Sequence, residues 1–121
     1  MTNSPAVTRC IDQLLERVPE LRAVYEEHVH DYDELLPHVF LGDVTRYVVQ
    51  RVRSGETTFS TEPIRRVLES IEQYLASGDE EVEELAWVSF AENLSEHEDV
   101  LTFLRGMIGP NLAKALKQYG R

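Results

Sequence analysis

Apolar residues recur at helical spacing along almost the whole chain, and no segment shows the apolar–polar alternation of a strand. Proline, glycine and capping residues divide this pattern into six or seven short helices. The predicted helix starts are Ser4-Pro5, Pro19, Pro37, Thr61-Glu62-Pro63, Asp79, Ser95 and Gly109-Pro110. The stretch Ser54–Thr61 is predicted to be a loop, with Phe59 tucked against the core. The expected fold class is all-α.

The stretch Asp79–Leu94 carries the widest apolar surface and is expected to be the central helix. Gly78 can close the preceding helix, and Asp79 can cap this one. The apolar face comprises Val82, Leu85, Ala86, Ser89, Phe90 and Asn93, and it is widened by Trp87 and Leu94. A helix that is apolar over most of its circumference usually has neighbours on several sides. We therefore expect residues 1–121 to form a single-domain bundle around residues 79–94.

Three local contacts are predicted around the end of this central helix. The segment Ser95-Glu-His-Glu98 fits a capping box that starts the next helix. Asn93 interrupts the apolar face and is expected to satisfy buried backbone groups, such as those at a neighbouring helix end. Glu92 is expected to pair with Arg65 or Arg66 across the helical hairpin that the tight turn at Gly78 creates.

Size and charge narrow the range of functions. The chain has 121 residues, enough for one core but not for two. Its net charge of −10 disfavours nucleic-acid binding, because neutralising phosphates requires clustered Lys and Arg. No apolar run is long enough to span a membrane and no leader pattern is present, so the expected location is cytoplasmic. The lone Cys10 lies in an apolar stripe and is expected to be a buried thiol.

Acidic charge is concentrated between residues 79 and 99, which include nine carboxylates and no Lys or Arg. One interpretation is the ordinary polar surface of a soluble protein. The other is a surface that attracts a basic protein partner. The partner-binding residues would then be Glu80, Glu83, Glu84, Trp87, Glu96, Glu98 and Asp99. Trp87 either packs in the core or anchors this interface, a role in which tryptophan is enriched.

Three of the four histidines fall between residues 28 and 38, and Glu27-x-x-His30 has the spacing of di-iron bundles. This raises the alternative of a small metal-binding helical enzyme that uses His28, His30, Asp31 and His38. Helical phase argues against convergence, because His30 faces away from the core while His28 lies on the apolar face. A hydrogen-bonded core histidine is expected at His28. With no catalytic motif elsewhere, we expect no catalytic residues, no metal and no cofactor.

A third possibility is a helical homodimer that serves as an adaptor or scaffold. Val88 lies apart from the main apolar face, so the central helix offers apolar surface there as well as on the Trp87 side. The arginine-rich region Arg46–Arg66 can also meet the acidic face of a second copy.

Three stretches, taken in order, resemble a known family. They are Phe40-Leu-Gly-Asp-Val-Thr-Arg-Tyr-Val48, then Ile71-Glu-x-x-Leu75 with Gly78-Asp-Glu-x-Val82 and Phe90-Ala-Glu-Asn-Leu94, and finally Leu104 through Ile108-Gly-Pro110. From roughly Pro19 to Tyr119 the chain resembles small, acidic, all-helical bacterial proteins of uncharacterised biochemistry. Members of that kind are met beside polymorphic or contact-dependent toxins as candidate immunity proteins. The resemblance implies a non-enzymatic binding protein that neutralises a toxin domain, and no catalytic residues carry over.

Overall fold

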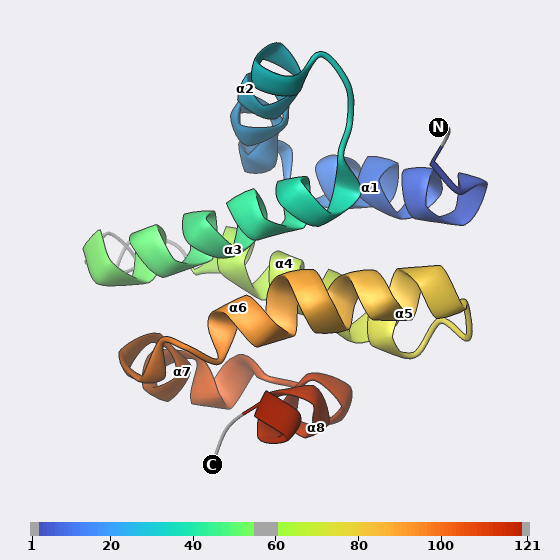
Figure 1. Cartoon of the computed structure of the whole chain (residues 1–121). Coiled ribbons are helices and arrows are strands. Elements are labelled where there is room, and N and C mark those ends of the chain that lie inside the picture. Colours follow the sequence, from blue (N-terminus) through green and yellow to red (C-terminus); the bar gives the residue numbers. More distant parts are fainter. Residues whose placement is uncertain (1–2, 55–60, 120–121) are drawn as a thin grey trace.

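The computed structural model describes residues 3–54 and 61–119, and every regular element in those residues is a helix (Figure 1). The elements are α1 (Pro5–Arg17), the 3₁₀ turn η1 (Pro19–Leu21), α2 (Arg22–Tyr32), α3 (Pro37–Ser54), α4 (Glu62–Leu75), α5 (Glu80–Ala86), the π-helical segment η3 (Trp87–Ala91), α6 (Glu92–Leu94), α7 (Glu98–Leu104), the 3₁₀ turn η4 (Arg105–Met107) and α8 (Pro110–Tyr119). Because α5, η3 and α6 are continuous, the described residues form seven helices and no strand. The predicted all-α bundle of six or seven helices is confirmed. The predicted packing of Phe59 against the core concerns a residue outside the described part of the chain. Among the described helices, none is both long enough and apolar enough to span a membrane.

Two helix starts follow the predicted caps. The Ser4 hydroxyl accepts a hydrogen bond from the Val7 N–H at 3.4 Å at the start of α1. Asp79 Oδ1 accepts one from the Val82 N–H at 3.1 Å at the start of α5. Between α4 and α5 the chain turns at Gly78, whose φ of 80° is strained for residues with a Cβ. These local signals explain why the starts of α1 and α5 follow directly from the sequence.

The continuous helix α5–η3–α6 lies at the centre of the bundle. It packs against α1, α3, α4 and α8, and Figure 1 shows α3 running alongside it. Its buried side chains are Val82, Leu85, Ala86, Ser89, Phe90, Ala91 and Leu94. Phe90 and Phe40 are the largest fully buried side chains of the core. Burying one such side chain contributes about 1.5–3 kcal/mol, so this contact surface is a large part of what holds the bundle together.

The predicted capping box at the start of α7 is wrong. The Ser95 hydroxyl donates to the Glu92 carbonyl at 2.6 Å instead of accepting from the following turn. The last turn of α6 continues into Ser95, whose N–H donates to the Ala91 carbonyl at 2.9 Å. The hydroxyl is therefore directed back along α6, and α7 begins at Glu98 after His97 without a side-chain cap.

Candidate functional site

Three predicted carboxylates and Trp87 lie together at the start of the central helix. Glu80, Glu84 and Trp87 follow the spacing that repeats on one helix face. Glu80 and Glu84 are exposed, whereas Glu83 is half-buried and its Oε2 accepts a hydrogen bond from the Gly78 N–H at 2.9 Å. Among the described residues, neither Glu80 nor Glu84 lies within ion-pair distance of a Lys or Arg. We call Glu80, Glu83, Glu84 and Trp87 the α5 acidic face.

Trp87 lies at the boundary between the core and the solvent. Its half-buried ring packs against the core and meets Tyr119 of α8 in an edge-to-face contact, with centroids 6.1 Å apart and planes at 65°. Trp87 follows Glu84 by three residues, a spacing that places the two side chains on the same helix face. The two alternatives for Trp87 are therefore compatible, and its role as an interface anchor stays a prediction.

The structure separates the other three predicted partner-binding residues. Glu98 lines a groove between α7 and α8, and Glu96 lines a hollow of about 410 Å³ where α3 meets the end of α6. Asp99 instead forms an ion pair with Arg53, whose Nε and Nη2 donate to Oδ2 and Oδ1, each at 3.0 Å. These bonds lower the pKa of Asp99 to about 2. Glu96, Glu98 and Asp99 thus have neighbours other than the α5 acidic face, and a single binding surface made of all seven residues stays a prediction.

Most of the basic side chains between residues 46 and 66 are paired within the chain. The ion pairs join Arg46 to Asp43, Arg53 to Asp99, and both Arg65 and Arg66 to Glu62. The predicted pairing of Arg65 or Arg66 with Glu92 is wrong, because Glu62 lies one turn away on the same helix and is within easier reach. The acidic face of a second copy would compete with these internal carboxylates for the arginine side chains. The homodimer stays a prediction.

His28 is a core histidine, as predicted. It is 1% exposed, and its Nε2 accepts a hydrogen bond from the Leu36 N–H at 3.0 Å. An accepting Nε2 carries no proton, so the neutral ring carries its proton on Nδ1. Nδ1 lies 3.4 Å from Asp43 Oδ2 but makes no aligned hydrogen bond. Burial lowers the pKa of His28, and the nearby Asp31 opposes this only in part.

The rest of the histidine cluster does not converge. His30 is exposed beside Asp31, with Nδ1 and Oδ1 3.5 Å apart. His38 contacts the central helix, where its Nδ1 lies 2.5 Å from Ser89 Oγ. Within residues 3–54 and 61–119, no three His, Cys, Asp or Glu side chains gather closely enough to hold a metal ion. The three histidines proposed for the metal-binding alternative therefore lie in different surroundings: His28 is buried, His30 is exposed and His38 contacts the central helix.

The central helix contains a π-helical turn that the sequence pattern did not predict. The Glu92 N–H bonds to the Trp87 carbonyl, five residues earlier. The Ser89 carbonyl accepts from Thr45 Oγ1 at 3.3 Å and from Asn93 Nδ2 at 2.9 Å. A π turn holds one residue more than an α turn, so the positions after it rotate away from their expected phase. This explains why Asn93 is exposed instead of lying on the apolar face. It does satisfy a buried backbone group, as predicted, but that group is the Ser89 carbonyl of its own helix.

Such turns frequently occur at functional sites, and this one places Trp87 at its first position. The only trace of it in the sequence is polarity: Ser89 and Asn93 interrupt an otherwise apolar face. Polar residues at positions that the helical spacing places on the buried face indicate backbone groups that need hydrogen-bond partners. They do not by themselves reveal which helical hydrogen bond is displaced.

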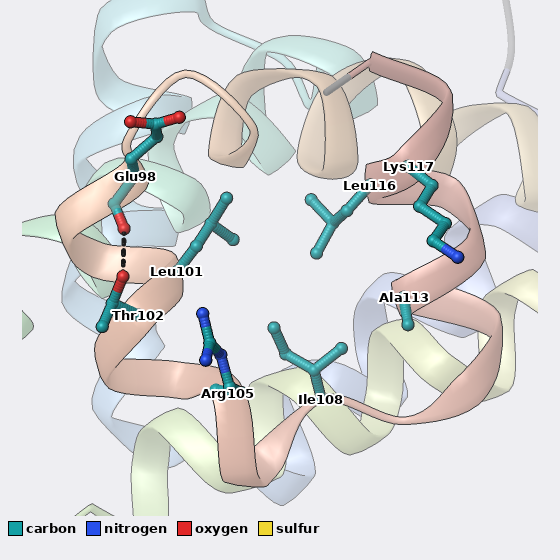
Figure 2. A pocket seen from close by; sticks show the side chains of 8 residues that line it. All are labelled: Glu98, Leu101, Thr102, Arg105, Ile108, Ala113, Leu116 and Lys117. Atoms are coloured by element: carbon teal, nitrogen blue, oxygen red, sulfur yellow. Dashed lines mark hydrogen bonds between the residues drawn. The ribbon is translucent and has the colours of Figure 1, made fainter. Parts of the chain in front are cut away.

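A groove of about 830 Å³ opens between α7, η4 and α8 (Figure 2). We call it the α7–α8 groove, and define it by Leu101, Arg105, Ile108, Ala113, Leu116 and Lys117, with Glu98 and Thr102 on its rim. In Figure 2 the side chains of Leu101, Ile108 and Leu116 point into one open space. The sequence did not predict this groove. Its walls come from two helices, and the spacing of apolar residues in each helix does not determine the angle between them.

Together these features define a small all-α bundle with an acidic helix face and a separate apolar groove. Residues 11–121 match the family model described as "Domain of unknown function (DUF7674)", and the chain belongs to this family. The match confirms the expected membership of a biochemically uncharacterised family. Comparison with curated proteins and with solved structures gives no match.

Proposed function

We propose that this chain is a non-enzymatic binding protein that captures a basic protein partner on the α5 acidic face. The observation that carries the proposal is the state of Glu80 and Glu84, which are exposed and have no cationic partner among the described residues. Unpaired carboxylates attract a basic surface and speed encounter. The accessible edge of Trp87 supplies contact area beside them.

The partner class that we propose is a bacterial toxin domain, so that the chain acts as an immunity protein. The resemblance of its sequence to proteins met beside toxins supports this choice. A face carried by a helix of the core is already ordered, which keeps the entropy cost of binding low. Because exposed charges each contribute little, we expect the face to act mainly through association rate and to weaken as salt rises.

Co-expression tests the proposal. The candidate partner is a small C-terminal domain of a secreted, multidomain protein encoded beside this gene. The chain should relieve the toxicity of that domain and co-purify with it. Without such a neighbour, and with pull-downs that recover only the chain itself, the immunity function is abandoned.

Charge reversal tests the placement of the site. A Glu80→Lys/Glu84→Lys variant should slow association with the toxin domain at low salt while its helicity stays unchanged. The matched control is Glu16→Lys/Glu20→Lys, which makes the same charge change at two exposed residues near the junction of α1 and α2. Equal slowing by both variants would show that only net charge matters, and would remove the α5 acidic face as the site.

A further inference from the structure

The α7–α8 groove differs in character from the α5 acidic face. Leu101, Ile108 and Leu116 pack against the core on one side and remain partly exposed on the other. Figure 2 shows these side chains approaching one another across the groove. An apolar floor of this kind gains free energy when a partner covers it, because contact removes apolar surface from water.

The groove also carries the opposite charge. Arg105 and Lys117 line it from η4 and α8 respectively, and neither forms an ion pair with any described residue. Glu98 is the only carboxylate among the residues that line the groove, and in Figure 2 it points away from Arg105. Two unpaired cations beside an apolar floor are notable in a chain with a net charge of −10. This combination favours an occupant that is both apolar and anionic.

We infer that the α7–α8 groove binds an acidic amphipathic helix of a partner protein. Apolar side chains one turn apart on that helix enter among Leu101, Ile108 and Leu116, and its flanking carboxylates meet Arg105 and Lys117. Grooves between two helices recognise amphipathic helices in this way, through anchors at i, i+3 or i+4, and i+7. The ten residues of α8 span about 15 Å at 1.5 Å per residue, which matches two to three turns of a bound helix.

This inference does not rest on the proposed function, since it concerns another surface and a partner of opposite charge. The test uses two synthetic helical peptides with the same leucine stripe, flanked by Glu in one and by Lys in the other. Binding is measured by fluorescence anisotropy of the labelled peptide, and its location by methyl NMR of the full chain. The Glu peptide should shift the methyl signals of Leu101, Ile108 and Leu116, and should bind about tenfold more tightly than the Lys peptide.

Two test variants and one matched control locate the binding site. Arg105→Glu/Lys117→Glu should reverse the preference between the peptides, because both substituted side chains are exposed and the apolar floor is unchanged. The matched control, Arg9→Glu/Arg22→Glu, makes the same charge change at exposed residues of α1 and α2 and should preserve the preference. Leu116→Ser should weaken binding of both peptides, with circular dichroism confirming an intact fold.

Several results would overturn the inference. They are equal affinity for the two peptides, methyl shifts confined to other parts of the molecule, or a preference that the control variant abolishes as well. Binding of dodecanoate at these methyl groups with no binding of either peptide would identify a lipid site instead. Concentration-dependent shifts of the same methyl groups without peptide, together with a dimeric mass by light scattering, would identify a second copy as the occupant.

Discussion

Glu72 on α4 caps the N-terminus of α8, where its Oε1 accepts a hydrogen bond from the Leu112 N–H at 2.9 Å. Its other carboxylate oxygen, Oε2, accepts from the Asn111 N–H at 2.7 Å. The first N–H groups of a helix have no partner within the helix, and a carboxylate there also meets the positive end of the helix dipole. Glu72 thereby positions α8, which forms one wall of the α7–α8 groove and supports Trp87 through Tyr119.

Replacing Glu72 should destabilise the protein through this cap. Glu72→Ala is expected to lower the free energy of unfolding by about 1 kcal/mol, the usual effect of losing a helix N-cap. Urea denaturation measures the loss, and NMR should show the amide signals of Asn111 and Leu112 moving. Glu69→Ala is the control, because Glu69 is exposed one turn earlier on α4. Equal losses for the two variants would contradict the capping role.

Gly109 leaves the space that this carboxylate needs. A Cβ added at Gly109 would lie 2.6 Å from Glu72 Cδ, so Gly109→Ala should displace the cap and destabilise the protein. Gly106→Ala is the control, since a Cβ there meets nothing within 4 Å. In a Glu72→Ala background, Gly109→Ala should cost much less, because the clash and the cap involve the same group. Strictly additive free energies of unfolding would show that Gly109 acts independently of Glu72.

The contrast between predicted and unpredicted features follows from the range of the interactions. The helix starts at Ser4 and Asp79 depend on contacts three residues apart, which sequence spacing reveals. The cap at Leu112 depends on Glu72, 40 residues earlier, and no local pattern connects the two. The ion pair of Asp99 with Arg53 spans 46 residues and gives one predicted partner-binding carboxylate an internal partner that no local pattern reveals.

The α5 acidic face was predictable because all its members lie before the π turn takes effect. Glu80, Glu84 and Trp87 keep α-helical phase, so their common side could be read from spacing alone. Beyond Trp87 the added residue rotates the helix, so Asn93 is exposed instead of lying on the apolar face as expected. Periodicity locates a helix well, but it presumes a constant number of residues per turn.

The buried His28 should make stability depend on pH. Its pKa in the folded chain is lowered from the ordinary value of 6.5, so the unfolded chain binds more protons between those two values. The contribution of His28 to the free energy of unfolding is therefore fully present above pH 6.5 and is lost as the pH drops toward the lowered pKa. His28→Gln should flatten this slope, whereas His30→Gln, at an exposed residue, should keep it. Should His28→Gln fail to fold, ring-nitrogen NMR of the unaltered protein at neutral pH gives an independent check. It should find the proton on Nδ1, and a proton on Nε2 would contradict the structure.

The ion pair between α3 and α7 should be visible in the titration of a single carboxyl. Arg53→Gln should raise the pKa of Asp99 from about 2 toward its ordinary value of 3.8, because the two charged hydrogen bonds are lost. Any stability that this pair contributes is present above pH 3.8 and is lost as the pH falls toward 2. Carboxyl-carbon NMR measures the pKa directly. Arg66→Gln, which breaks a pair with Glu62 instead, should leave the Asp99 titration unchanged.

Trp87 is the only tryptophan, so its fluorescence reports on the edge of the proposed binding face. Tyr119 contacts the indole ring edge to face, and Tyr119→Ala should make the contacted part of the indole more accessible to water. We expect a red-shifted emission, stronger quenching by acrylamide and a loss of about 0.5–1.5 kcal/mol of stability from the missing aromatic contact. Tyr32→Ala is the control, because Tyr32 is already 47% exposed and belongs to α2. Emission and quenching that stay unchanged in Tyr119→Ala would mean that α8 does not cover Trp87 in solution. The accessible area assigned to the α5 acidic face would then have to be redrawn.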